Sequence, residues 1–348
     1  MSEITNLHDL PLVVGVDIGG TQVRVAVLQG ATLLSRVDLL TGENAIPERL
    51  ISCIYNAVRK ALDEASTRLD QIIGIGIGSP GPLDSHTGIV FDPPNMPGWH
   101  NVPLRDIFKE HYDLPVFVEN DTNAAALGEY LFGAGRGSRS MVYLTISTGI
   151  GGGVIINGKI LGGISGTAAE LGHITIDRHG DRCNCGNIGC LESIASGTAI
   201  ARRANEAMAG DIDFRNWMSE RLPHNIAVSE LATLPVNKDE SGQKNLVDAR
   251  LVAEAAAKGV PLACEIIHDA AEAIGIGLTN IIHIFNPELI ILGGGVTQIG
   301  PLLIEPALHI VQERAMKVPR DAVRIVQAQL GTDAGLVGAG ALIYSNIS

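Results

Sequence analysis

The sequence predicts an α/β protein made of two related domains, and three observations support this fold class. The chain has 348 residues, too many for one ordinary hydrophobic core and enough for two domains of roughly 100–200 residues each. A strand, a glycine turn and a second strand occur at 12–28 and again at 141–156, which indicates an internal duplication. Between and after these units, further apolar strands alternate with stretches of helical periodicity.

The order of elements in the first half follows from apolar spacing and turn residues. Two strands are expected at 12–18 and 22–28, joined by the glycine turn. Residues 44–69 are expected to form an amphipathic helix, since apolar residues recur at helical spacing and a proline suits its first turn. A buried strand at 71–79 precedes a Pro/Gly loop, and the strand LPVFVEND leads into the helix TNAAALGEYLF.

The second half is expected to be richer in helices. After the duplicated unit, an Asn-Gly pair indicates a hairpin into KILGG. Helices are expected over 192–209 and 250–284, a strand at 287–295 and a terminal helix at 333–347. Residues 210–247 are polar and are expected to be irregular, with NKDESGQK as an exposed loop; the sequence suggests no role for them.

Charge and composition exclude several classes of partner. The net charge is −13, no Lys/Arg run exceeds two residues and aromatic residues make up 4%, which argues against nucleic acid. The N-terminus lacks the basic and apolar regions of an export signal, and no apolar run reaches the ~18 residues of a membrane span. We therefore expect a cytoplasmic protein, in which disulfides rarely persist.

Three of the five cysteines lie near a histidine within residues 170–193, in the pattern H-x9-C-x-C-x4-C. Four N/S donors are the number that a closed tetrahedral zinc site uses, whereas the expected compartment disfavours a disulfide knot. A set of free or redox-active thiols is the other alternative. A zinc ion with four protein ligands would be structural, and it would fix the loop that carries Glu170 and Glu192. The four expected ligands are His173, Cys183, Cys185 and Cys190.

Three amide-rich glycine turns suggest a nucleotide triphosphate as a ligand. In DIGGT at 17–21, two glycines can present N–H groups to an anion, and Asp17 beside them suggests an intervening Mg²⁺. The alternative for this segment alone is a simple hairpin turn whose aspartate bonds the local backbone. STGIGGG in the second unit and LGGG at 292–295 offer two further turns of this kind.

Asp121 is the candidate for proton transfer. It follows a strand and precedes a helix, in VENDTNAAA. An aspartate there can be a helix N-cap, but Asn120 can equally be the cap and leave Asp121 free. A carboxylate at a domain junction near phosphate-binding turns is a candidate general base for a hydroxyl.

The motifs DIGGT, END, TGIGGG, ELGH and CNCGNIGCLE occur in this order between residues 13 and 295, and together they resemble the ROK family of sugar kinases and sugar-responsive repressors. The resemblance implies the duplicated actin-like ATPase fold, with ribonuclease H-like domains as in hexokinases and the active site in the interdomain cleft. It also implies a small N-terminal domain of residues 1–121 plus 335–348. The large C-terminal domain, with the zinc motif, would then comprise 122–334.

The resemblance also implies roles for individual residues. Asp121 would be the general base that takes the proton from the 6-hydroxyl of the sugar. Gln22 stands where many family kinases have lysine, although Arg24 offers positive charge nearby. The residues implied to hold the sugar are Asn95, Asn120, Asp121, Glu170, His173 and Glu192. The residues implied to form the ATP·Mg²⁺ site are Asp17, Gly19, Gly20, Thr21, Thr148, Gly149, Gly294 and Gly295.

The reaction that this resemblance implies is ATP-dependent phosphorylation of glucose at its 6-hydroxyl, a glucokinase activity. N-acetylmannosamine, N-acetylglucosamine and fructose stay open as alternative substrates. A sugar-sensing repressor is the alternative from another class, although only sixteen residues precede Asp17, so no helix-turn-helix segment is expected there. The expected partner is a small-molecule sugar, without nucleic acid or membrane, and the resemblance implies a homodimer or homotetramer.

Overall fold

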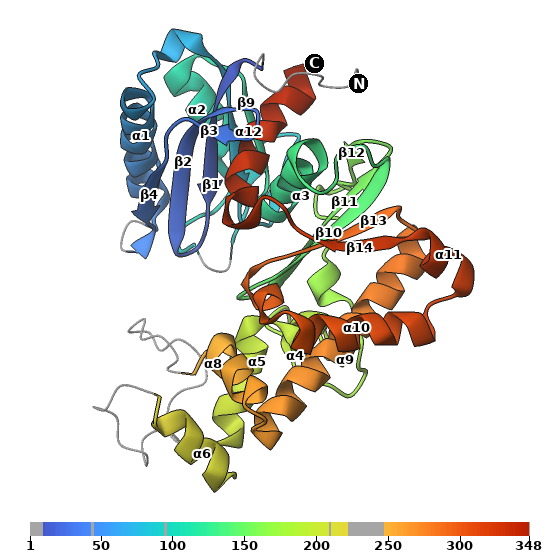
Figure 1. Cartoon of the computed structure of the whole chain (residues 1–348). Coiled ribbons are helices and arrows are strands. Elements are labelled where there is room, and N and C mark those ends of the chain that lie inside the picture. Colours follow the sequence, from blue (N-terminus) through green and yellow to red (C-terminus); the bar gives the residue numbers. More distant parts are fainter. Residues whose placement is uncertain (1–9, 43–44, 94–95, 209, 222–246, 348) are drawn as a thin grey trace.

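The computed structural model describes residues 10–42, 45–93, 96–208, 210–221 and 247–347 and contains two large sheets of the same topology (Figure 1). The strand orders are β3-β2-β1-β5-β9 and β12-β11-β10-β13-β14. In each sheet the first two long strands pair antiparallel, and two later strands add in parallel beside the first. This repetition of order and direction confirms the predicted duplication.

The strands lie close to the ranges that the sequence predicts. Those of the first sheet are β1 Leu12–Ile18, β2 Gln22–Gln29, β3 Thr32–Leu33, β5 Ile72–Ser79 and β9 Val116–Asn120, with β4 Val37–Leu40 paired to β2. Those of the second sheet are β10 Ser140–Ile146, β11 Ile150–Ile156, β12 Lys159–Ile160, β13 Leu289–Gly293 and β14 Arg324–Gln327. A small third sheet joins β6 Leu83–Asp84, β7 Ile89–Val90 and β8 Val102–Pro103.

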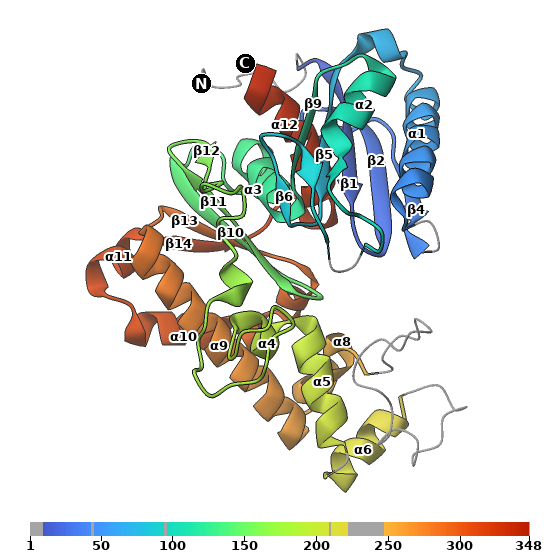
Figure 2. The same cartoon turned by 180° about the vertical axis from the view of Figure 1, so that it is seen from behind.

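Helices cover both sheets and also lie between them. On the outer side of the first sheet are α1 Pro47–Glu64 and α2 Leu104–Tyr112 (Figure 2). Between the sheets lie α3 Asp121–Phe132 and α12 Ala334–Ile347, which contact each other. The outer side of the second sheet is covered by α4 Leu191–Ala195, α5 Gly197–Ala207, α8 Ala249–Ala257, α9 Pro261–Phe285 and α10 Pro301–Arg314, with α11 Lys317–Ala322 beside them.

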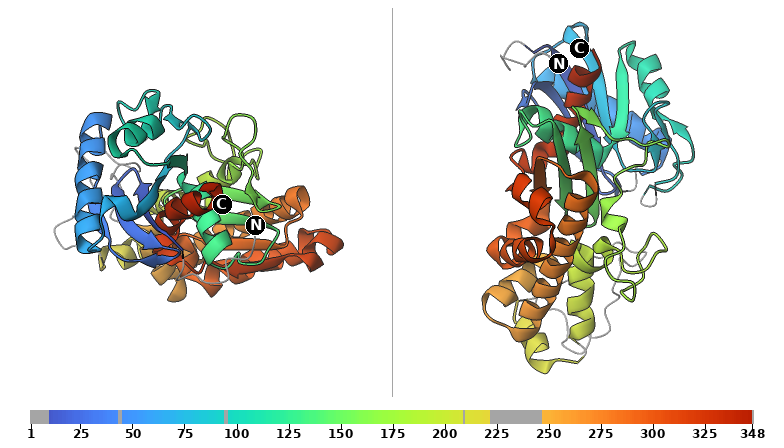
Figure 3. Two further views of the ribbon diagram at one scale, coloured as in Figure 1. Left: turned by 90° about the horizontal axis from the view of Figure 1, so that it is seen from above. Right: turned by 90° about the vertical axis from the view of Figure 1, so that its right-hand side faces the viewer.

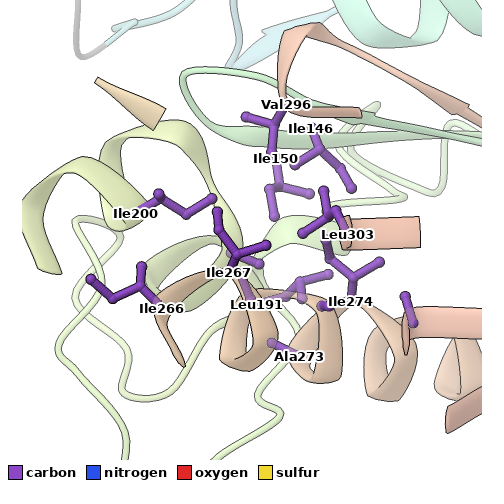
Figure 4. Close-up of a cluster of buried hydrophobic side chains, with 14 of the residues drawn as sticks. Ile146, Ile150, Leu191, Ile200, Ile266, Ile267, Ala273, Ile274, Val296 and Leu303 are labelled. Atoms are coloured by element: carbon purple, nitrogen blue, oxygen red, sulfur yellow. The ribbon is translucent and has the colours of Figure 1, made fainter. Parts of the chain in front are cut away.

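These layers make the molecule longer than it is wide, as the side view in Figure 3 shows. The core beneath the second sheet unites strand residues with helix residues. Figure 4 labels Ile146 and Ile150 from β10 and β11 close to Leu191 of α4 and Ile274 of α9. Because β10 and β11 each place an isoleucine in this core next to their shared turn, the core fixes the base of that turn.

The predicted domain division at residue 121 stays a prediction. Helix α3 begins at Asp121 and would belong to the large domain, yet it contacts β5 and β9 of the first sheet as well as β10 and β11 of the second. Helix α12 follows β14 and contacts β1 and β5 of the first sheet. The predicted division likewise assigns residues 335–348 to the small domain.

The sequence prediction was wrong for part of residues 210–247. Residues Ile212–Ser219 form a helix, α6, because the side chain of Asp211 accepts a hydrogen bond from the N–H of Phe214 at 2.8 Å. Phe214 and Met218, one helical turn apart, are both buried. The segment NKDESGQK lies outside the described residues.

Among the helices of the described ranges, none has both the length and the apolar character needed to cross a bilayer.

The contact between α3 and α12 generates a stability prediction. A Cβ on Gly338 would lie 2.0 Å from the carbonyl oxygen of Ala124, so the two backbones touch there. Gly338→Ala should therefore lower the free energy of unfolding by about 1–3 kcal/mol, measured by chemical denaturation. Gly210→Ala is the matched control, since a Cβ there would meet its nearest atom at 3.9 Å. Equal stability of both variants would contradict the close contact.

Candidate functional site

Asp121 is the first residue of α3, and Asn120 before it is the N-cap. Oδ1 of Asn120 accepts hydrogen bonds from the backbone N–H groups of Thr122 at 3.0 Å and Asn123 at 3.2 Å. Of the two alternatives for the cap, the structure therefore selects Asn120. Oδ1 of Asp121 accepts a bond from the N–H of Thr122 at 2.7 Å, which engages one of its two carboxyl oxygens.

The carboxyl of Asp121 lies in an acidic, half-buried environment. Burial, reinforced by repulsion from Asp17 and more weakly from Glu170, raises the pKa of Asp121 to about 6, although bonds from Thr122 oppose the shift. Gly78 lies between the two aspartates, since a Cβ on it would be 3.6 Å from Cα of Asp121 and 3.8 Å from Oδ1 of Asp17. A carboxyl that ionises this close to neutral pH is suited to take a proton from a hydroxyl.

Asp17 lies near the end of β1, opposite Arg24 on β2. Burial raises the pKa of Asp17, and the positive charges of Arg24 and Arg36 oppose that rise. Nη1 of Arg24 is 3.5 Å from Oδ2 of Asp17 and donates a hydrogen bond to the carbonyl of Thr332 at 2.8 Å. Arg24, the positive charge expected to lie near the position where many family kinases have lysine, is therefore beside Asp17.

The first glycine turn joins β1 to β2. The N–H of Gly19 donates to the carbonyl of Gln22 at 2.9 Å, and the hydroxyl of Thr41 donates to the carbonyl of Gly19 at 2.8 Å. Thr41 also donates its N–H to the carbonyl of Thr21 at 3.0 Å. The segment is thus a hairpin turn, and it leaves Gly20 and Thr21 exposed, where a ligand can reach them.

The second and third glycine turns lie next to each other. Thr148 and Gly149 connect β10 to β11, and Gly294 follows β13, which pairs with β10. Gly294 has a φ of +88°, and a Cβ on it would lie 2.3 Å from the carbonyl oxygen of Ile146, so only glycine fits there. At Gly295 a Cβ would meet no atom within 4 Å, which leaves open space beside the third turn.

An open hollow lies between the loop after β5, the start of α3 and the segments beside β11. Among the predicted sugar residues, Asn120 and Glu170 line it. Burial raises the pKa of Glu170, His173 opposes this rise and Glu192 adds to it, so the three side chains are close enough to interact. Asn95 lies outside the described residues.

The histidine and three cysteines converge as the sequence predicted, with their ligand atoms within 4.8 Å of one another. Sγ of Cys185 is 3.7 Å from Sγ of Cys190, and Sγ of Cys183 is 3.6 Å from Nδ1 of His173. Tetrahedral zinc with bonds of ~2.3 Å to sulfur and ~2.05 Å to nitrogen requires sulfur–sulfur edges of about 3.8 Å and sulfur–nitrogen edges of about 3.6 Å. The cluster is therefore compatible with structural zinc, and none of its three cysteines forms a disulfide.

Sequence reasoning missed several residues that line the hollow. Thr122 and Asn123 follow Asp121 directly, and Thr167 and Ala168 come shortly before ELGH. Nδ2 of Asn123 donates to the buried Glu119 at 3.1 Å, while its buried Oδ1 has no partner among the described residues. In the sequence, only their nearness to Asp121 or to ELGH could have marked these residues, because the hollow is formed by segments far apart in the chain. These lining residues are Gly81, Pro82, Leu83, Thr122, Asn123, Gly151, Gly152, Gly166, Thr167 and Ala168.

Two sheets of equal topology, with crossing helices between them and a site at their junction, define the actin-like ATPase fold that the sequence predicted. A family model described as the ROK family matches residues 13–346, and the chain belongs to that family. A glucokinase of Thermotoga maritima is 37% identical over 335 residues, 96% of this chain and 98% of that protein.

Two further comparisons represent the two classes in the family. The crystal structure of a ROK family glucokinase from Streptomyces griseus in complex with glucose and AMPPNP has a TM-score of 0.76 and 33% identity, covering 95% of this chain and 98% of that one. A xylose repressor of Caldicellulosiruptor bescii is 30% identical over 342 residues, 97% of this chain and 79% of the repressor.

The environment of Asp121 generates a prediction about stability and pH. Because the folded protein holds the pKa of this carboxyl at about 6, above its ordinary value of 3.8, ionising Asp121 costs folding free energy as pH rises between those two values. Asp121→Asn removes the charge and should raise the free energy of unfolding at pH 8 by about 1–2 kcal/mol. At pH 4, where the folded carboxyl is protonated and the unfolded one about half ionised, the difference should fall to about 0.5 kcal/mol or less.

Urea denaturation at both pH values is the measurement, with Asp113→Asn, at an exposed aspartate, as the control. A variant Asp121→Asn that is less stable than the wild type at pH 8 would contradict the electrostatic description of this site.

Proposed function

We propose that this protein is an ATP-dependent glucokinase that transfers the γ-phosphoryl group of ATP to the 6-hydroxyl of glucose. The observation that carries the proposal is the position of Asp121, which directly follows Asn120 at the hollow and lies near Asp17 beside the first glycine turn. The glucokinase relatives, one of them 37% identical, support glucose as the sugar.

In this proposal Asp121 accepts the proton of the 6-hydroxyl while the sugar oxygen bonds to the γ-phosphorus and the bond to ADP breaks. A pKa of about 6 leaves the carboxyl ionised at neutral pH and close enough in basicity to act as a general base. Asn95, Asn120, Glu170, His173 and Glu192 would hold the other hydroxyls, which fixes the sugar in line for transfer.

The three glycine turns would hold the nucleotide. Their residues are Gly19, Gly20, Thr21, Thr148, Gly149, Gly294 and Gly295. Asp17 fits a role beside Mg²⁺, because it lies near Asp121 in an acidic environment where a divalent cation would relieve the repulsion between the two carboxylates. A bound Mg²⁺ would supply charge neutralisation of the phosphates.

We also propose that His173, Cys183, Cys185 and Cys190 hold one structural zinc ion. Their separations match the edges of a tetrahedral site, and four protein ligands fill the coordination shell. The ion would stabilise the loop between Glu170 and Glu192. With Nδ1 of His173 turned toward the thiols, Nε2 of the same ring would be the atom left for the sugar.

The purified protein should therefore contain about one zinc ion per chain, measured by elemental analysis. Cys185→Ser should lose most of the zinc and lower the melting temperature, because metal binding contributes to folding of the loop. Cys264→Ser, at an exposed cysteine on α9, is the matched control and should keep the zinc. The proposed site would be contradicted if the wild type without zinc had the same activity and the same melting temperature as the wild type with zinc.

A coupled ADP-release assay over glucose, N-acetylmannosamine, N-acetylglucosamine and fructose tests the function. Glucose should give the highest kcat/KM, and kcat should fall as pH drops through about 6 because Asp121 becomes protonated. Asp121→Asn should lower kcat by roughly 10²–10⁴ and change the affinity for glucose much less. ADP release with none of these sugars would overturn the proposal, and a preference for another sugar would change the substrate only.

A sugar-sensing repressor is the second candidate, favoured by the xylose repressor that aligns with 97% of this chain. The two candidates differ in what they do with ATP and DNA. Sugar-dependent release of a DNA fragment in a gel-shift assay, without sugar-stimulated ADP release, would favour the repressor.

A further inference from the structure

The turn between β10 and β11, which carries Thr148 and Gly149, is held at its base by the hydrophobic core. Ile146 before it and Ile150 after it are both buried, and Leu191 of α4 belongs to the same cluster (Figure 4). The turn itself projects out of this core, with Thr148 exposed to solvent. Packing therefore fixes where the turn starts and ends, and hydrogen bonds must fix the residues between.

Those hydrogen bonds come from the segment that follows the cysteine cluster. Oε2 of Glu192 accepts a bond from the N–H of Ile150 at 2.8 Å. The N–H of Gly197 donates to the carbonyl of Ser147 at 2.7 Å. Thr198 donates to the carbonyl of Thr148 twice, from its hydroxyl at 2.8 Å and from its N–H at 3.3 Å. Residues 192–198 thus bind the turn at both ends.

The same bonds determine which backbone groups of the turn stay available. The carbonyls of Ser147 and Thr148 accept from residues 197–198, and the carbonyl of Gly149 accepts from the N–H of Ser147 at 2.8 Å. Within the described part of the chain, the N–H groups of Thr148 and Gly149 have no hydrogen-bond partner. Two consecutive N–H groups without a partner can both donate to an anion.

Glu192 also restricts what the turn can contain. A Cβ on Gly149 would lie 2.5 Å from Oε2 of Glu192, so the carboxylate packs directly against the glycine. Glu192 also lies close enough to Glu170, which lines the hollow, for the two carboxyl groups to interact electrostatically. One carboxylate therefore touches the predicted nucleotide turn and lies beside the predicted sugar residues.

We propose that Glu192 and Thr198 are positioning residues for the anion-binding turn, and that Glu192 couples sugar binding to nucleotide binding. The inference rests on the proposed function. A sugar hydroxyl that bonds to the second oxygen of Glu192 restricts the side chain to the rotamer in which Oε2 holds Ile150. Sugar thereby orders the turn before the nucleotide arrives, and by linkage the nucleotide strengthens sugar binding by the same factor.

Thr198 allows the positioning role to be tested apart from the sugar. Thr198→Val removes the hydroxyl bond to Thr148 and should weaken binding of a non-hydrolysable ATP analogue with Mg²⁺ by about three- to tenfold in calorimetry. Thr198→Ser keeps a hydroxyl and should bind the analogue like the wild type. Glucose affinity without nucleotide should be equal in all three proteins. Unchanged analogue affinity in Thr198→Val would overturn this part of the inference.

The coupling is tested by titrating the same analogue with and without saturating glucose. Glucose should tighten analogue binding about fivefold or more in the wild type. In Glu192→Ala the factor should fall close to one, whereas Glu192→Gln keeps an oxygen that can accept from Ile150 and should retain the coupling. A wild type without coupling, or a Glu192→Ala variant that keeps it at saturating glucose, would overturn the proposal.

These outcomes are separate from a failure of the proposed function. If the wild type phosphorylates glucose but shows no coupling, or if Glu192→Ala keeps the coupling, only the coupling is contradicted. A wild type that releases no ADP with any sugar contradicts the kinase itself. Circular dichroism spectra of all variants identify any loss of folding.

Discussion

The contact between the backbones of α3 and α12 is the constraint on which the site depends. Gly128 and Gly338 let the two helices touch, since a Cβ on Gly128 would lie 2.9 Å from the nitrogen of Gly338. The N-terminal end of each helix then points at one of the two aspartates of the site. Asp121 begins α3, and a Cβ on Gly335 in the first turn of α12 would lie 2.7 Å from Oδ2 of Asp17. The crossing therefore places the first turns of both helices beside the two carboxylates.

Placing two carboxylates so close together costs stability, and the fold offsets only part of this cost. Burial and mutual repulsion raise the pKa of Asp121, while the positive ends of two helices and the guanidinium of Arg24 favour the ionised forms nearby. Replacing Asp121 by a neutral residue would relieve the repulsion but remove the proposed base. In the proposed mechanism the unfavourable energy has a use, because a carboxyl that ionises near pH 6 is more basic, and so a better proton acceptor, than an ordinary one.

Sequence reasoning succeeded where the signal was local. The strand before Asp121 and the four candidate zinc ligands follow from residues close together in the chain, and the structure brings those ligands within 4.8 Å. The duplication was visible because each of its two units is a short local pattern of strand, turn and strand. Sequence reasoning failed where contacts join distant segments. The bond from Ile150 to Glu192 spans 42 residues, and no local pattern marks it. Helix α6 was missed because its two buried side chains, Phe214 and Met218, are too few to produce visible periodicity.

The loop that carries the cysteines shows why a metal suits this position. Between residues 177 and 189 most side chains are polar and exposed, so the loop has little apolar surface to hold its shape. Gly189 has a φ of +68° and packs against the carbonyl of Asp177, where a side chain would not fit. A loop without its own core needs another source of order, and four convergent ligands can provide it. The order then extends along the chain, because Cys190 directly precedes Leu191, which is anchored in the core, and Glu192, which holds Ile150. The proposed metal site, the proposed sugar site and the turn that carries Thr148 and Gly149 are thus linked through three consecutive residues.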